Sequence, residues 1–483
     1  MLYFLGTIIY NLYFHPLHHI PGPKVNSLSR IPYVRHLLKG TTADNVKDLH
    51  NTYGDVVRVS PNEVSFSSGE TAWPDIYGFR IGKMKGHNTM LKDRVWYAPP
   101  ANGVPSILIA DDANHSRGRK TLSHAFSEKA LNEQEALIQG YVDLLINRLK
   151  EVTSTSKAPV NMVEWYNWTT FDVIADLLFG EPFGCLQDLQ THKYIELLFH
   201  SVEGFRFGYI LHYFPFFRYL GRLIIDPSAV AARKEYMQWV TSQTEKRISR
   251  ETQRPDFMTE ILKHNGEKDA ALSNAEMASN AQLILTAGSE TTATLLSGVT
   301  YLLLKNPAVL QKLKSEIRGK FTTYDEMTIE AVNNTPYLIA VLSEALRYFP
   351  PVPTGFNRIV PSGGEVVSGV YIPEKTSVYV SSYANAHTER NFKDPETFAP
   401  ERWMGDAKYA GDKLASNQPF SFGPRACLGK NLAYAEMRLI LAKMVWQFDW
   451  ELDGGSENWL EESKVFLLWK KPVLGVRLVD VRN

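Results

Sequence analysis

One stretch near the C-terminus holds the residue types that a thiolate-ligated cofactor requires. Cys427 offers a soft sulfur ligand, and Arg425 precedes it by two residues. Phe420 opens the stretch, and Gly423 and Gly429 flank the cysteine. A cysteine thiolate on a haem iron pushes electron density toward O–O bond cleavage, and an arginine can pair with a haem propionate. The spacing therefore predicts a haem site in which Cys427 is the iron ligand and Phe420 packs beside the sulfur.

The residues after this cysteine have the spacing of a buried helix. Apolar side chains recur at steps of three and four residues, at Leu432, Ala435, Leu439, Ala442 and Trp446. Cys427 would then lie just before a helix N-terminus, where free amide groups and the helix dipole favour a thiolate. Gly423 and Gly429 would let the backbone turn sharply and pack against a flat macrocycle. A buried structural cysteine is the alternative, but it would need neither the arginine nor both glycines.

Upstream, an acid and an alcohol stand side by side within a long helical pattern. Glu290 and Thr291 follow Ala287 and Gly288 in a proline-free stretch that covers residues 272–304. An acid can relay protons to a bound oxygen molecule, and a hydroxyl can hydrogen-bond it. The glycine would let dioxygen and water approach the backbone. Without the cysteine, these small residues would equally indicate a helix packing seam.

These stretches resemble the cytochrome P-450 superfamily of haem–thiolate monooxygenases. The resemblance extends from Pro21 to the C-terminus and implies haem b, held by Cys427 beneath a long central helix. It implies that Glu290 relays protons and that Thr291 stabilises the oxygen intermediate. The entry to the chain, Phe14-His15-Pro16-Leu17, is similar to that of fungal microsomal members. Within the superfamily the chain most resembles secondary-metabolism enzymes of the isotrichodermin-hydroxylase-like and benzoate-hydroxylase-like types.

Two further motifs of the superfamily supply one acid and two arginines. Glu344 and Arg347 form a Glu-x-x-Arg motif, and Arg402 belongs to a Pro-Glu-Arg-aromatic segment. The resemblance implies that both guanidinium groups hold the Glu344 carboxylate and thereby lock the segment that leads to Cys427. Taken alone, Glu344 and Arg347 would indicate no more than a weak surface ion pair. We assign the trio a structural role.

The resemblance also implies which residues contact the haem propionates. His115 stands where many members have tryptophan, and Arg119 follows four residues later. Arg358 comes shortly after the Glu344 helix. We expect these three residues and Arg425 to contact the propionates, although a solitary histidine is also common on protein surfaces.

Composition excludes several other classes of protein. The chain has 483 residues and a formal net charge of zero, so it lacks the basic excess that a nucleic-acid partner would require. Two cysteines cannot build a disulfide framework, a four-cysteine zinc site or an iron–sulfur cluster. Because Cys427 is assigned to the iron, Cys185 is expected to be a buried packing residue.

The chain must obtain its electrons from another protein. No Walker loop or Gly-x-Gly-x-x-Gly fingerprint is present, so we expect no flavin or nicotinamide site. The resemblance implies a separate NADPH-dependent flavoprotein reductase, which makes NADPH an indirect cofactor. Arg117, Lys120 and Lys430 could form a basic face for an acidic reductase, and a merely solvated charged face is the alternative.

The fold is predicted to be mainly α with small β-sheets. Helical patterns cover residues 127–150, 160–179, 228–250, 272–304, 307–319, 335–348 and 430–447. Short β-branched runs lie at 55–60, 63–67, 376–382 and 473–479. The motifs from His115 to Gly429 must converge on one cofactor, so residues 21–483 should form a single haem–thiolate monooxygenase domain.

The N-terminus is expected to attach the protein to a membrane. Leu2–Phe14 is apolar apart from Thr7 and Asn11, but it is shorter than the roughly 20 residues that span a bilayer. We interpret residues 1–20 as a short or truncated anchor in the endoplasmic reticulum membrane, with the catalytic domain facing the cytosol. The stretch 199–219, rich in Phe and Tyr, would be a second membrane contact, with core packing as the alternative.

We therefore expect a monooxygenase of fungal secondary metabolism that inserts one oxygen atom from O2 into an apolar small molecule. The substrate pocket should be lined from 90–110, 199–215, Leu283–Ala287, Thr354–Phe356 and Phe466–Trp469. Two alternatives stay open: a haem–thiolate isomerase or dehydratase that needs no reductase, and a non-catalytic haem-binding protein. The Glu290–Thr291 pair argues against both.

Overall fold

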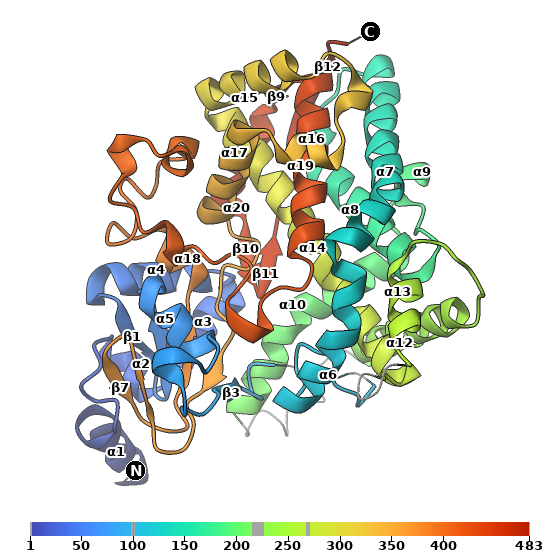
Figure 1. Cartoon of the computed structure of the whole chain (residues 1–483). Helices are drawn as coiled ribbons and strands as arrows, with labels where there is room; N and C mark the ends of the chain where they lie inside the picture. The colour runs from blue at the N-terminus through green and yellow to red at the C-terminus, as the bar shows by residue number, and fades with distance from the viewer. Residues whose placement is uncertain (1, 98–99, 101, 215–226, 267–270, 483) are drawn as a thin grey trace.

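The computed structural model describes residues 2–97, 100, 102–214, 227–266 and 271–482. Helices dominate this part of the chain, and a smaller region with short strands lies beside them (Figure 1). The described part of the chain is therefore mainly α with small sheets, as the sequence predicts.

Four long helices form the centre of the helical region. They are α7 (Glu128–Thr155), α8 (Met162–Phe179), α14 (Asn274–Lys305) and α19 (Lys430–Gln447). The closest packing is between α8 and α14, and α19 packs on both α7 and α14 (Figure 1). These helices contribute about half of the buried residues in the largest hydrophobic cluster. Because α14 and α19 carry the two chemically informative stretches, the core fixes their relative position.

The other helices surround this centre. They are α1 (Leu2–Ile9), α2 (Lys24–Leu28), α3 (Ile31–Lys39), α4 (Thr42–Tyr53), α5 (Gly69–Tyr77), α6 (Asp112–Ser123), α9 (Cys185–Asp188), α10 (Lys193–Tyr213), α12 (Pro227–Ile248), α13 (Phe257–His264), α15 (Pro307–Lys320), α16 (Ile329–Asn333), α17 (Pro336–Tyr348), α18 (Ser382–Ala386) and α20 (Trp459–Glu462). The predicted helices are confirmed, whereas several others were missed, among them α3, α4, α5, α6, α10 and α13. The polar sequence of α6 carries no apolar stripe, which is the signal that the prediction used.

The largest sheet has the strand order β1-β2-β8-β5-β3. Its strands are β1 (Val56–Ser60), β2 (Glu63–Phe66), β8 (Ser377–Val380), β5 (Arg358–Ile359) and β3 (Leu91–Lys92). Only β2 and β8 run parallel within it. The short β3 strand was not predicted, because two residues carry no periodic pattern. It matters for the site, since it pairs with the strand that holds Arg358.

The remaining strands form one three-stranded sheet and two hairpins. The sheet has the order β4 (Val160–Asn161), β12 (Gly475–Asp480) and β9 (Phe448–Leu452). The hairpins are β6 (Glu365–Val367) with β7 (Val370–Ile372), and β10 (Lys464–Phe466) with β11 (Leu468–Lys470). A single residue, Leu467, connects β10 to β11.

The N-terminal segment is helical and exposes apolar side chains. A π-helix, Tyr10–Phe14, continues α1, and the exposed residues are Leu5, Ile8, Ile9, Tyr10, Tyr13 and Phe14. In the described ranges, no single helix has the length and apolar character of a membrane span. The α14–α15 pair meets both criteria jointly but bends by 111°.

The aromatic stretch 199–219 contains both inward-packed and exposed rings where it is described, and Phe207 is exposed. Tyr209 of α10 is buried and packs on Tyr33 of α3, with 5.5 Å between the ring centroids. Tyr213 joins the same cluster. These two rings therefore pack inward, as the alternative held. Residues 215–219 lie outside the described residues.

Candidate functional site

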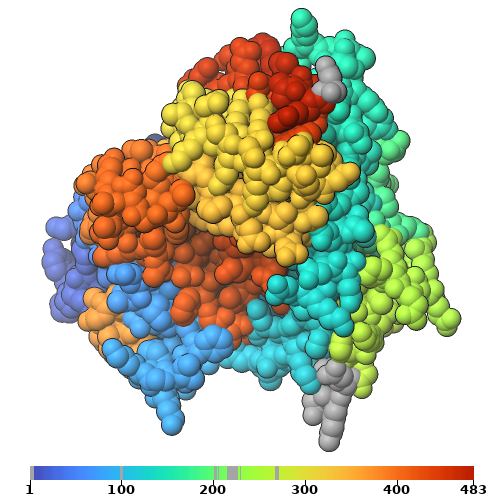
Figure 2. All heavy atoms as spheres, turned by 45° about the horizontal axis from the view of Figure 1, so that its top comes forward, coloured from blue at the N-terminus to red at the C-terminus, as the bar shows by residue number. Residues whose placement is uncertain are grey.

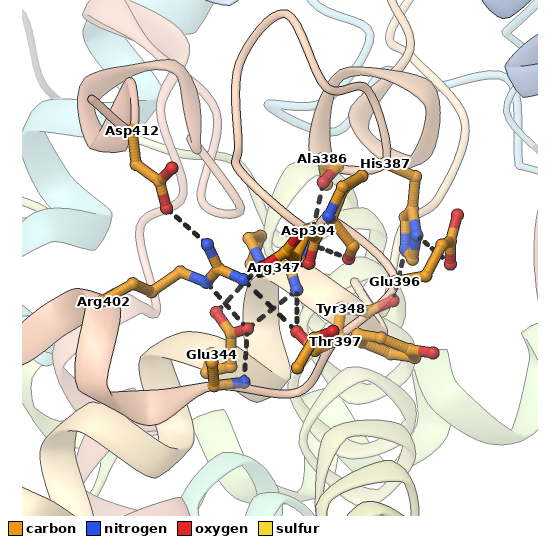
Figure 3. Close-up of polar contacts among 12 residues, drawn as sticks. Glu344, Arg347, Tyr348, Ala386, His387, Asp394, Glu396, Thr397, Arg402 and Asp412 are labelled. Atoms are coloured by element: carbon orange, nitrogen blue, oxygen red, sulfur yellow. Dashed lines mark hydrogen bonds and ion pairs between the residues drawn. The ribbon is translucent and has the colours of Figure 1, made fainter. Parts of the chain in front are cut away.

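A buried network of charges holds the segment that precedes the cysteine loop. Arg347 donates two hydrogen bonds to the Glu344 carboxylate, at 2.8 and 2.9 Å, and Arg402 donates a third at 3.0 Å (Figure 3). Trp403 Nε1 and the Ala399 amide complete the shell of donors. The charged side chains are 0% exposed. The predicted contacts within the trio are confirmed, and its structural role stays a prediction.

This network also fastens distant backbone. Arg347 donates to the carbonyl oxygens of Ala386 and Pro395, and Arg402 pairs with Asp412 (Figure 3). A buried carboxylate satisfied by two guanidinium groups tolerates little displacement, because each broken contact would leave a charge without a partner. The chain between α18 and the cysteine loop is therefore held in one arrangement.

The cysteine loop is a tight turn that ends at α19. The Cys427 amide donates to the Phe420 carbonyl at 2.8 Å, which closes the loop. Gly429 is the N-cap of α19, so Cys427 lies just before a helix N-terminus, as predicted. In the space-filling view, the orange-red part of the chain that includes this region is recessed between yellow, orange, cyan and blue segments (Figure 2).

Cys427 faces an internal space. Its residue surface is exposed, yet burial by the surrounding protein raises the pKa of the thiol. Both observations hold if the sulfur borders an enclosed cavity and not the outer surface. The Gly429 amide, Arg119 and Lys430 act in the opposite direction and favour the thiolate. Cys185, by contrast, is buried at 1% exposure and burial raises the pKa of its thiol to about 12, so it is an inert packing residue, as predicted.

The two loop glycines have different physical roles. Gly423 has φ +76°, and a Cβ there would collide with the Tyr77 carbonyl. The sharp turn expected at Gly423 is confirmed, and it brings the backbone close to the end of α5. The expected packing against a macrocycle stays a prediction. Gly429 has φ −84°, and a Cβ there would meet only Phe126, at 3.8 Å, among the described protein atoms. Gly429 therefore does not adopt the positive φ for which we expected a glycine at this position.

One face of α14 borders open space. Ala287 is exposed although its helix is central, and Thr291 lies one turn later on the same side. The Thr291 hydroxyl donates to the Ala287 carbonyl at 2.7 Å. Gly288 lies on another side, where a Cβ would stand 2.8 Å from Ile174 of α8. Gly288 therefore allows close helix packing, and the expected approach of dioxygen to its backbone stays a prediction.

Glu290 points away from this open face. It is 2% exposed and forms an ion pair with Lys471, whose side chain is 3% exposed. Thr294 Oγ1 donates to Glu290 Oε1 at 3.1 Å. Glu290 and Thr291 are adjacent in the sequence, but the structure places their side chains on different sides of the helix.

The predicted propionate residues converge, and one further cation joins them. Lys92 lies opposite Arg358 in the β3–β5 pair. Burial, and after it the charges of Arg358 and Arg425, lower the pKa of Lys92 well below the usual value. His115 is buried, and burial together with Arg425 and Arg119 lowers its pKa to about 4. The His115 imidazole is therefore neutral at physiological pH. Lys92 was missed because its position depends on the β3–β5 pairing.

This cluster has donors left for an anion. Arg358 Nε and Arg425 Nη1 are buried and find no hydrogen-bond partner among the described residues. Arg425 Nη2 is already engaged by the Ala110 carbonyl and Asp112, each at 2.8 Å. Buried cationic donors without partners are costly unless an anion binds them. Two carboxylates, as a haem carries, fit this demand, while the Cys427 sulfur supplies the ligand for the iron.

A small apolar cavity lies between α3, α10 and the β10–β11 hairpin. Its lining consists of Tyr33, Leu37, Thr42, Trp96, Tyr209, Thr354, Val465 and Leu467. The residues that fall in the predicted pocket ranges are Trp96, Tyr209, Thr354 and Leu467. Those from α3 and α4 were missed, since nothing in the sequence links them to the distant hairpin.

Comparison with known proteins settles the family. A family model described as Cytochrome P450 matches residues 25–475. The chain is a cytochrome P450. Curated relatives include "Cytochrome P450 monooxygenase traB" of Penicillium crustosum, which is 59% identical over 98% of this chain and 94% of the relative. "Averantin hydroxylase" of Dothistroma septosporum is 42% identical over 99% of this chain and 90% of the relative.

A third curated relative also covers the chain over its full length. "Cytochrome P450 monooxygenase lcsI" of Purpureocillium lilacinum is 46% identical over 100% of this chain and 93% of the relative. This P450 is a haem-dependent monooxygenase with a cysteine thiolate ligand, and its electrons come from a reductase. When bound, the haem activates dioxygen, and one oxygen atom enters the substrate.

Proposed function

We propose that this P450 oxidises an apolar small molecule of fungal secondary metabolism. The observation that carries this proposal is the cluster of buried cations at the Cys427 loop, where donors of Arg358 and Arg425 without a partner among the described residues fit the carboxylates of a haem. The named relatives support it, because one of them is a hydroxylase of averantin. The Glu290–Thr291 pair favours monooxygenation over isomerisation, dehydration or haem binding without catalysis, since cleavage of dioxygen consumes two protons that an acid and a hydroxyl can deliver.

In the proposed site each residue has one task. Cys427 is the metal ligand, and the Phe420, Gly423 and Gly429 backbone shapes its loop. His115, Arg119, Arg358 and Arg425 bind the cofactor together with Lys92. On the other side, Ala287 and Gly288 set the shape of the α14 wall. Glu290 brings protons, and Thr291 directs them to the open face that it borders.

The redox partner and the membrane belong to the same proposal. A separate NADPH-dependent flavoprotein reductase would dock near Lys120 and Lys430, which are exposed. Arg117 contributes less to this face than we expected, because it pairs with Glu276. Residues 1–20 would anchor the protein in the endoplasmic reticulum membrane, with residues 21–483 in the cytosol. The exposed apolar side chains of α1 support this arrangement.

The central test is spectroscopic. The purified protein with haem should show the strongly red-shifted Soret band of a thiolate-ligated ferrous–CO complex. Cys427→Ala should lose this band and the matched Cys185→Ala variant should keep it. Loss of the band in Cys185→Ala alone would refute the ligand assignment.

The substrate class is tested on the same protein. Apolar fungal metabolites that enter the pocket should shift the haem spin state, and the compounds that do so should be converted only when reductase and NADPH are present. Conversion without reductase would favour the isomerase or dehydratase alternative. The absence of any conversion by a correctly assembled system would favour the non-catalytic one.

A further inference from the structure

A buried lysine from the far end of the chain holds the acid of the proposed relay. Lys471 Nζ contacts Glu290 and also donates to Thr294 Oγ1 at 2.7 Å. Thr294 Oγ1 in turn contacts Glu290 Oε1, so the three groups form a closed triangle. Glu290 Oε2 is buried and lacks a hydrogen-bond partner in the described part of the chain. The carboxylate is thus held through one oxygen only.

This arrangement separates the acid from the place where protons are needed. Adjacent residues of an α-helix point about 100° apart, and Thr291 lies with Ala287 on the open face. Glu290 and Thr294 share the face that Lys471 covers. As long as the ion pair persists, the 2% exposed Glu290 carboxylate is closed off from bulk water. A proton relay through Glu290 therefore requires that Lys471 release it.

Lys471 follows the hairpin whose tip lines the apolar cavity. It directly follows β11, and Leu467 at the tip of the β10–β11 hairpin lines that cavity. Leu467 has φ +89°, a region that a non-glycine residue adopts only when its surroundings enforce it. Its side chain packs on the Trp96 cluster. Between this tip and Lys471, Trp469 Nε1 donates to the Pro350 carbonyl at 2.8 Å, so a shift of the segment must break this hydrogen bond.

We propose that Lys471 is a positioning residue that gates proton supply, and that the β10–β11 hairpin couples this gate to substrate binding. The cavity measures only about 20 Å³, so a substrate that binds there must displace the Leu467 tip. The strained turn relaxes, the segment behind it shifts, and Lys471 loosens its contact with Glu290. The carboxylate then turns toward water and Thr291. This inference rests on the proposed role of Glu290 in the monooxygenase reaction.

The first test measures proton supply without any substrate. We would compare NADPH oxidation by the holoenzyme with reductase, in H2O and D2O, for wild type, Lys471→Gln, Lys471→Arg and Glu290→Gln. Lys471→Gln should raise the rate several-fold and reduce the solvent isotope effect, because Glu290 is no longer held. Lys471→Arg, which keeps the charge, should stay close to wild type.

A double variant shows whether the effect passes through Glu290. Lys471→Gln combined with Glu290→Gln should return to the rate and isotope effect of Glu290→Gln alone. This variant also carries no unpaired buried charge, so it should fold even if Lys471→Gln is unstable. Equal rates and isotope effects in wild type and a folded Lys471→Gln, or additive effects in the double variant, would overturn the proposal.

The second test follows the hairpin itself. 1-Phenylimidazole, which binds haem iron and fills the adjacent space, should increase amide hydrogen exchange in residues 468–472 of wild type. Leu467→Gly removes the side chain and the strain, and should abolish this response. Val366→Gly in the β6–β7 hairpin is the matched control and should retain it. An unchanged exchange rate in wild type would refute the coupling to the cavity.

These outcomes are separable from failure of the proposed function. If the function is wrong, wild type will lack the thiolate–CO band or reductase-dependent NADPH oxidation. If only the gate is wrong, wild type will show both, and the Lys471 and Leu467 variants will behave like their controls.

Discussion

Lys92 and Arg358 lie directly opposite each other in the β3–β5 strand pair. The proximity of Arg358 is one reason, after burial, for the lowered pKa of Lys92. Like charges that face each other across a strand pair destabilise it. Such a pair is explained if an anion binds between the two cations, and the orphaned Arg358 Nε supports this interpretation.

The first prediction is that Lys92 has opposite effects in the two forms of the protein. Lys92→Met should raise the melting temperature of the haem-free protein slightly, because it removes a repulsion of about 0.2–1 kcal/mol. It should also accelerate haem loss several-fold. Thermal denaturation and haem transfer to an acceptor protein measure the two effects. Lys83→Met, at an exposed position, should change neither, and slower haem loss from Lys92→Met would contradict the assignment.

The second prediction separates the fold from the chemistry. Arg347→Ala leaves the buried Glu344 carboxylate short of a partner, which should cost roughly 3–5 kcal/mol of unfolding free energy. Little haem-loaded protein should be recovered. The control is Arg390→Ala, whose partner Asp55 is 40% exposed; a surface pair of this kind contributes about 0–1 kcal/mol. A fully loaded, stable Arg347→Ala protein would refute the structural role.

The third prediction concerns the hydroxyl on the open face of α14. Thr291→Ala should retain haem and substrate binding but divert NADPH to hydrogen peroxide, because protons are no longer directed to the oxygen that must be cleaved. The ratio of product to NADPH consumed should fall several-fold. Thr291→Ser keeps the hydroxyl and should largely restore the ratio. Equal ratios in all three proteins would show that Thr291 takes no part.

The fourth prediction is a pH dependence of stability from Glu436 on α19. Its carboxyl is buried at 1% exposure, and burial raises its pKa to about 8. The folded state therefore holds a proton that the unfolded state releases above its ordinary pKa, near 4.3. Stability from this group is present at low pH and is lost as the pH rises toward 8.

Glu436→Gln should remove this loss. Between pH 6 and 8.5 its melting temperature should fall less than that of wild type, and the two proteins should differ most at the alkaline end. Glu330→Gln, at an exposed site, is the control. A parallel decline in wild type and Glu436→Gln would show that Glu436 is already ionised in the folded protein.

The sequence alone determined the features that depend on local spacing. Cys427 before a helix, Glu344 and Arg347 one turn apart, and the long pattern around Thr291 each lie within a few residues, so helical periodicity is enough to predict them. The buried trio with Arg402 followed from a second short motif. In each case the chemistry and the spacing are encoded in the same short segment.

Tertiary structure decided the contacts between segments that are distant in the chain. Only the strand register brings Lys92 to Arg358, and only the packing of the C-terminal hairpin brings Lys471 to Glu290. Gly288 is predictable as small, but its reason, the contact with Ile174, depends on how α8 crosses α14. Long-range contacts leave no periodic trace in a single sequence, because burial and pairing are properties of the assembled core and not of any one segment.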